Sequence, residues 1–190
     1  MNIYKFHSNP DELIGHTSRN FYFGDEAKEL ILQGKEVPKV IGDLYLMRTP
    51  ITALPDNLTV QGGLYLSGTA ITALPDNLKV GGGLVLTDTP ITALPDNLTV
   101  HGDLYLSGTP ITALPDNLKV GGDLSLYDTD IKSLPDNLTV QGALYLNGTP
   151  ITALPDNLKV GGNLWINSTP NLDKDNLPSS LVVKGNIRYK

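Results

Sequence analysis

The stretch Ile-Thr-Ala-Leu-Pro-Asp-Asn-Leu at residues 51–58 decides the fold, because it returns almost unchanged every 20 residues. Further copies begin at Ile71, Ile91, Ile111 and Ile151, and a slightly altered copy begins at Ile131. Self-similarity at a short fixed period is typical of a solenoid, in which each copy forms one rung of a coil. We therefore expect a stack of 20-residue rungs.

One copy contains a short strand and a turn. The residues Leu64, Tyr65 and Leu66 alternate in hydrophobicity, which predicts a strand with both leucines facing the core and the tyrosine facing outward. Pro55 lacks the backbone donor that a central strand needs, so its segment belongs to another side of the coil. The Asp-Asn pair at 56–57 suits a turn there. A single copy cannot bury its aliphatic side chains alone, so the rungs must stack.

The terminal segments differ from the copies. We expect an N-terminal cap over residues 1–36, a solenoid over 37–170 and a degenerate capping copy over 171–190. Residues 25–33 predict a short helix, because acidic side chains occupy its first turn and a glycine follows it. Residues 8–14 are interpreted as a further helical turn.

The repeat resembles the core of leucine-rich repeats, through the motif Leu64-x-Leu66-x-x-Thr69-x-Ile71 followed by Leu74-Pro75. Its length and its Leu-Pro pair are similar to the short repeats of bacterial effector-type members. The resemblance implies a right-handed coil with a parallel β-sheet on one face and short turns or 3-10 segments on the other. It also implies that the strand face binds proteins.

One position departs from the family pattern. The slot that holds Asn in the family holds Thr in every copy, at Thr49, Thr69, Thr89, Thr109, Thr129, Thr149 and Thr169. A hydroxyl lacks the two-donor amide of Asn, although it can still form a ladder between rungs. A β-helix with 20-residue turns is the alternative architecture, with a second strand within residues 57–60.

Composition and charge restrict the function. There is no cysteine, so disulfides and thiolate metal sites are excluded. The chain shows no apolar run of signal-peptide or membrane-span length, so we expect a cytoplasmic protein and no membrane partner. Residues 51–170 hold 11 Asp, 4 Lys and neither Glu nor Arg. Such an acidic array argues against direct nucleic-acid binding and favours a partner with a basic surface.

Signals for catalysis are weak. His7, His16 and His101 are scattered, and no spacing typical of a catalytic triad or of metal ligands links them. The glycines at 81–83 precede a predicted strand, which makes them a turn rather than a phosphate cradle. The Asp of each Pro-Asp-Asn is interpreted as a turn cap. We expect no enzyme activity, cofactor or metal; an enzyme site within residues 1–50 is the remaining alternative.

The copies disagree mainly in three outward columns around each Leu-x-Leu, whereas the exposed Asp-Asn pairs do not vary. Aromatic and acidic side chains on one sheet face are typical of a protein-binding surface, because rigid rings bury a large area at low entropic cost. The alternative is free drift at exposed positions, with Tyr present as a good strand former. The predicted protein-binding residues are Tyr45, Tyr65, Tyr105, Tyr145, Trp165, Asp103, Asp123 and Tyr127.

A second pattern alternates with a period of 40 residues. Thr and Lys take turns at 59, 79, 99, 119, 139 and 159, and two positions later Gly alternates with Gln or His. This period indicates duplication of a two-copy unit, and its Lys residues can offset the Asp column on alternate rungs. The pattern by itself assigns no function.

These observations favour a non-enzymatic solenoid that docks a protein on its Tyr/Trp/Asp strand face. The family resemblance implies a bacterial or phage effector or inhibitor, in the cytoplasm of a bacterium or an infected host cell. The alternative hypothesis is an acidic mimic of nucleic acid that occupies a DNA- or RNA-binding protein and dissociates steeply with salt.

Overall fold

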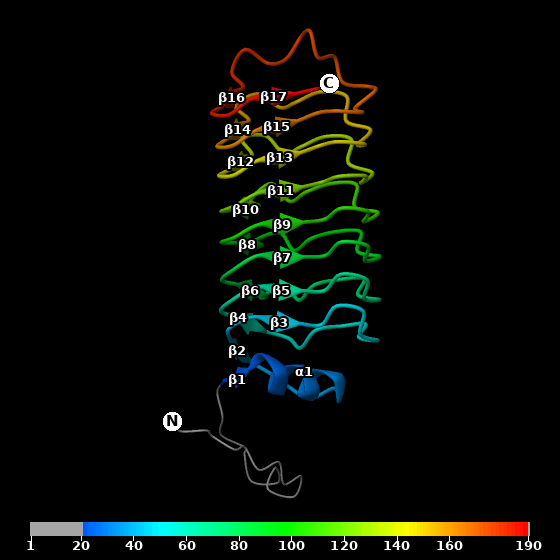
Figure 1. Cartoon of the computed structure of the whole chain (residues 1–190), viewed down its shortest axis with the longest axis vertical. Helices are drawn as coiled ribbons and strands as arrows, with labels where there is room; N and C mark the ends of the chain where they lie inside the picture. The colour runs from blue at the N-terminus through cyan, green and yellow to red at the C-terminus, as the bar shows by residue number, and fades with distance from the viewer. Residues whose placement is uncertain (1–20, 190) are drawn as a thin grey trace, which may run out of the picture.

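A computed structural model describes residues 21–189 of the chain. The helical turn expected at 8–14 and the side chains of His7 and His16 lie outside the described residues. The described chain is a parallel β-solenoid, with its rungs stacked along one long axis and a helix at the N-terminal end (Figure 1). The predicted solenoid is confirmed.

Two parallel sheets run along the coil. We name the first the Thr/Lys sheet, which has nine strands in the order β1 (Tyr22–Phe23), β2 (Lys39–Ile41), β4 (Thr59–Val60), β6 (Lys79–Val80), β8 (Thr99–Val100), β10 (Lys119–Val120), β12 (Thr139–Val140), β14 (Lys159–Val160) and β16 (Val182–Val183). We name the second the Tyr sheet, whose eight strands are β3 (Leu44–Tyr45), β5 (Leu64–Tyr65), β7 (Leu84–Val85), β9 (Leu104–Tyr105), β11 (Leu124–Ser125), β13 (Leu144–Tyr145), β15 (Leu164–Trp165) and β17 (Ile187–Arg188).

The register places equivalent residues of successive copies side by side. Val100 pairs with Val120 in the Thr/Lys sheet, and Leu104 pairs with Leu124 in the Tyr sheet. The backbone amide of Leu104 donates to the carbonyl of Asp123 at 2.8 Å, so the ladder also joins successive rungs. One 20-residue copy is therefore one rung.

The Tyr sheet corresponds to the strand predicted at Leu-Tyr-Leu. The Thr/Lys sheet lies at the second strand position, within 57–60, that the β-helix alternative expects. The third side of the rung, residues 51–58, is irregular and ends in a turn at 56–57, and no 3-10 segment occurs in the described residues. The architecture is thus a solenoid with two sheets and one irregular side.

The core is a continuous column of aliphatic side chains. Each rung contributes inward residues from all three sides, and in one central rung these are Ile91, Leu94, Leu98, Val100, Leu104 and Leu106, each at most 7% exposed. Burial of apolar area is the main stabilising contribution, and here it is shared between neighbouring rungs.

The Thr column does not tie the rungs together in a ladder. Thr109 is 2% exposed, and its hydroxyl donates to the carbonyl of Leu106 in the same rung at 2.7 Å. The same contact, three residues back, is made by Thr49, Thr69, Thr89, Thr129, Thr149 and Thr169. Each Thr therefore closes the turn that follows its own strand.

The helix predicted for residues 25–33 is present as α1 (Gly24–Leu32), which buries Ala27 and Ile31 against the first rungs. At the other end, Leu172 is buried, while Val182 in β16 is 48% exposed. No helix of the described residues is long and apolar enough to span a membrane.

Candidate functional site

The structure brings the predicted aromatic residues into one row. Tyr45, Tyr65, Tyr105, Tyr145 and Trp165 occupy the second position of their strands in the Tyr sheet, where side chains point away from the core. Val85 and Ser125 occupy the same row. These two smaller residues divide the aromatic row into three groups.

The aromatic groups at the two ends are stacked. The rings of Tyr45 and Tyr65 lie 4.6 Å apart at an interplanar angle of 12°, and those of Tyr145 and Trp165 lie 6.0 Å apart at 10°. Arg188 lies over the Trp165 ring at 5.9 Å, a cation–π geometry. Stacking follows from the parallel register, which places equivalent side chains one strand spacing apart.

Asp103 and Asp123 hold neighbouring rungs together. The Oδ1 atom of Asp103 accepts the backbone amide of Asp123 at 2.8 Å, and Oδ1 of Asp123 accepts the amide of Ala143 at 2.7 Å. The second oxygen of Asp103 accepts the hydroxyl of Tyr105 at 3.3 Å. These carboxylates therefore have a role inside the solenoid, and their contact with a partner remains a prediction.

This arrangement also explains an invariant glycine. A Cβ atom at Gly122 would overlap the Asp103 carboxylate and lie 2.9 Å from the carbonyl carbon of Gly102. Only glycine allows the rungs to approach at this corner while the carboxylate reaches the next amide.

The carboxylates also affect the tyrosines. Burial raises the pKa of Tyr105, and the negative charges of Asp103 and Asp123 raise it further. The pKa of Tyr145 is raised in the same way, by burial and then by Asp123. At Tyr45 the hydrogen bond to Asp43 is the main cause of the raised pKa. The hydroxyls of these tyrosines therefore hold their protons to a higher pH than an ordinary tyrosine does, and those of Tyr45 and Tyr105 donate to Asp43 and Asp103.

Tyr127 lies one column further along the rung and is 50% exposed. Ser125 on the same rung is buried, and its hydroxyl lies 2.9 Å from that of Ser107. Met47 occupies the column of Tyr127 and is 45% exposed beside Tyr45. Sequence reasoning omitted Met47 from the site, although its column was already recognised as variable.

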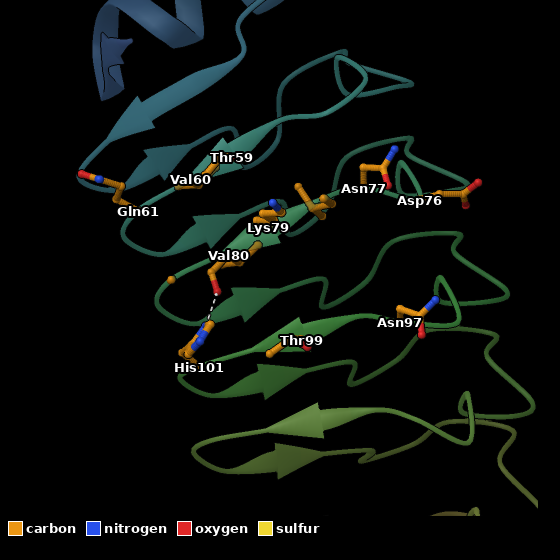
Figure 2. A pocket seen from close by; sticks show the side chains of 12 residues that line it. Thr59, Val60, Gln61, Asp76, Asn77, Lys79, Val80, Asn97, Thr99 and His101 are labelled. Atoms are coloured by element: carbon orange, nitrogen blue, oxygen red, sulfur yellow. Dashed lines mark hydrogen bonds between the residues drawn. The ribbon is translucent and has the colours of Figure 1, made fainter. Parts of the chain in front are cut away.

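The Thr/Lys sheet carries a groove that sequence reasoning missed. It has a volume of about 780 Å³, and Thr59, Lys79 and Thr99, from three neighbouring strands, are among the residues that line it (Figure 2). Asn77 and Asn97 lie on one side of it, and Gln61 and His101 lie on the other. The signal that could have found it is the 40-residue alternation at positions 59, 79 and 99 and at positions 61, 81 and 101.

His101 helps to define one edge of this groove. Its Nδ1 lies 3.2 Å from the carbonyl oxygen of Val80 in the preceding rung (Figure 2). On the opposite edge, the Asn77 side chain donates to Oδ1 of Asn57 at 3.1 Å. Within residues 21–189, no three His, Asp or Glu side chains gather in a way that could hold a metal ion.

Comparison with known proteins identifies no relative: neither a family model nor a curated protein matches this chain.

Proposed function

We propose that this protein is a non-enzymatic binding module that docks a protein partner on the outer face of its Tyr sheet. The proposed contact residues are the aromatic row of Tyr45, Tyr65, Tyr105, Tyr145 and Trp165, together with Tyr127. We further propose that the module acts as a leucine-rich-repeat-like effector or inhibitor of bacterial or phage origin. Its expected setting is the cytoplasm, which suits a chain without cysteine.

The supporting observation is the fixed arrangement of the aromatic side chains. Stacking at both ends of the row, and the hydrogen bond from Tyr105 to Asp103, hold the rings before any partner arrives. Little side-chain entropy is then lost on binding, which is a general route to affinity. Tyr and Trp are also the residues that most often dominate binding energy at interfaces.

Charge favours a basic partner. Asp43, Asp103 and Asp123 line the edge of the aromatic row, and the solenoid carries 11 Asp between residues 51 and 170. Complementary charge raises the rate of association and suppresses wrong partners more than it raises affinity. We therefore expect association to slow as salt concentration rises.

The test is the triple variant Tyr65→Ala, Tyr105→Ala and Tyr145→Ala. A partner is first captured with the unmodified protein and identified, and its affinity for both proteins is then measured by calorimetry. If each tyrosine contributes about 1–2 kcal/mol, affinity should fall by at least about a hundredfold.

The matched control is Thr72→Ala, Thr112→Ala and Thr152→Ala, three exposed positions at the same rung spacing on the irregular side of the solenoid, away from both sheets. The control should keep its affinity, and circular dichroism should show both variants folded. Unchanged affinity in the folded tyrosine variant would rule out the proposed face.

A further inference from the structure

The groove on the Thr/Lys sheet continues along the solenoid. A second groove of about 680 Å³ shares Thr99 and His101 with the first. Its other positions, among them Asn117, Lys119 and Thr139, lie 40 residues after their counterparts Asn77, Lys79 and Thr99. The two grooves are therefore consecutive units of one channel along the coil axis, and the unit repeats every two rungs.

Each unit has one lysine, which lies on the middle of the three strands that line it. Lys79 and Lys119 are exposed, and neither forms an ion pair with a carboxylate within the part of the chain that the structure describes. Figure 2 shows Asp76 at the outer end of its turn, with its carboxylate directed away from Lys79. The ammonium groups are thus available to an anionic ligand.

Packing explains why glycine alternates with Gln or His at positions 61, 81, 101 and 121, but it does not explain why lysine alternates with threonine two residues earlier. A Cβ atom at Gly81 would overlap the backbone carbonyl of Gln61, and Gly121 stands in the same relation to His101. Glycine is therefore required for steric reasons at this position on alternate rungs. The strand position carries no such restriction, because Lys79 is exposed and Thr occupies the same position in adjacent rungs.

The spacing of the lysines selects a ligand geometry. Parallel strands lie about 4.8 Å apart, so lysines on alternate rungs repeat every ~9.6 Å. A polyproline-II helix has three residues per turn and advances about 9.3 Å per turn, which brings every third side chain to the same side. In a β-strand, residues three apart face opposite sides, so an extended strand does not match the repeat.

The groove walls suit a polypeptide backbone in this conformation. A polyproline-II segment makes no internal hydrogen bonds, so its peptide groups need outside partners. The carboxamides of Asn77 and Asn97 offer both donors and acceptors at the edge of the channel. The hydroxyls of Thr59 and Thr99, on the strands that flank Lys79, add donors for a carboxylate, whereas that of Thr139 donates to the Asn137 carbonyl.

We propose that this channel binds a polyproline-II segment of a partner protein that carries an acidic side chain at every third residue. Successive acidic side chains pair with Lys79 and Lys119, and the segment lies along the solenoid axis. This site is separate from the aromatic row of the Tyr sheet, so the chain can hold two segments of one partner or two partners at once.

The test uses a fluorescent peptide of about four Pro-Pro-Glu triplets, a length that covers both units. Binding to the full chain is followed by fluorescence anisotropy at low salt. The double variant Lys79→Thr and Lys119→Thr places in the channel the residue that the adjacent rungs already carry, which keeps the fold. We expect it to bind about tenfold more weakly, as the loss of two exposed ion pairs predicts.

The matched control is Lys132→Thr. It removes a positive charge outside the channel, in a column where the equivalent residue of other copies, such as Thr112, is already Thr. It should bind like the unmodified chain, as should the tyrosine triple variant. Peptides of Pro-Pro-Lys triplets, or with Glu at every second residue, should not bind measurably.

Several results would overturn the proposal. These are no binding of the Pro-Pro-Glu peptide, equal binding by the double variant, equal binding of the peptide with Glu at every second residue, or binding of oligogalacturonate in place of the peptide. The last result would assign the channel to an acidic glycan. None of them bears on the aromatic face, whose test depends on the tyrosine variant.

Discussion

The two sheets of this solenoid share one core but present different surfaces. On the Tyr sheet Tyr recurs at 65, 105 and 145, the residues on the alternate rungs are Val85, Ser125 and Trp165, and the outward side chains contact one another through stacked rings and Asp–Tyr hydrogen bonds. On the Thr/Lys sheet the outward positions alternate regularly and leave an open channel. Because the inward residues of both sheets are constant aliphatics, the difference originates in the outward side chains alone.

The largest expected effect comes from truncating core side chains, which tests whether the two sheets contribute equally to the core. Leu104 (0% exposed) faces inward from the Tyr sheet, and Val100 (1% exposed) faces inward from the Thr/Lys sheet of the same rung. Leu104→Ala should lower the free energy of unfolding by about 2–5 kcal/mol, and Val100→Ala by about 1.5–3 kcal/mol, because fewer buried carbons are removed. Urea unfolding measures both, and a larger loss for Val100→Ala would show that the Thr/Lys sheet dominates the core.

The next effect concerns the buried hydroxyl that closes the turn after each Tyr-sheet strand. Thr109→Val should lower the free energy of unfolding by about 1 kcal/mol, because the hydroxyl contact to Leu106 is lost while the Thr109 amide still donates to that carbonyl at 3.1 Å. Thr99→Val, at an outward position of the Thr/Lys sheet, should change it by less than about 0.5 kcal/mol. Thermal unfolding distinguishes the two variants. Equal changes in their melting temperatures would contradict a stabilising role for the Thr109 hydroxyl.

A smaller effect separates the two Asp columns. Asp123→Ala removes the acceptor of the Ala143 amide and should lower the free energy of unfolding by about 0.5–1 kcal/mol. Asp116→Ala, in the exposed turn on the irregular side, should lie within about 0.5 kcal/mol of the unmodified chain. If chemical denaturation shows Asp116→Ala to be the more damaging change, the turn carboxylates support the fold and the Tyr-sheet carboxylates do not.

The smallest effect is a pH dependence confined to the Tyr sheet. The pKa of Tyr105 is raised above its ordinary value of 10.0 by burial and by Asp103 and Asp123. A raised pKa means that the folded state holds the proton more tightly, so stability is complete below about pH 10 and falls as pH rises through the folded pKa. Ultraviolet absorbance of tyrosinate, with unfolding followed in parallel, should show this loss.

The matched change is Tyr105→Phe, which has no proton to lose at this position. It should reduce the fall in stability above pH 10, while the aromatic row stays in place. An unchanged alkaline profile in this variant would place the titration on other residues.

Much of the fold could be predicted from the sequence, because the period and the spacing of aliphatics are local patterns. The Leu-Tyr-Leu alternation predicted the Tyr sheet and the outward aromatic row. The Thr/Lys sheet was harder to predict from the sequence, because Thr59 and Val60 form a strand too short to show an alternating pattern. Its pairing comes from residues 20 apart, which only a stack of rungs brings together.

For the candidate sites too, local sequence patterns could not predict contacts between neighbouring rungs. Variation among copies predicted the aromatic row, but it could not show that Asp103 and Asp123 each hold a backbone amide of the next rung. It also could not show that Thr109 acts within its own rung. Both depend on which way a short side chain turns once its neighbours are packed.

The sequence by itself determined that the chain forms a coil of repeated rungs, because a copy with regularly spaced aliphatics can bury them only against another copy. Tertiary structure alone decided which columns share a face, which carboxylate oxygens stay free and where the channel lies. The physical reason is that these features arise from contacts between residues separated by one full turn. Such contacts exist only when rungs stack at the spacing of parallel strands.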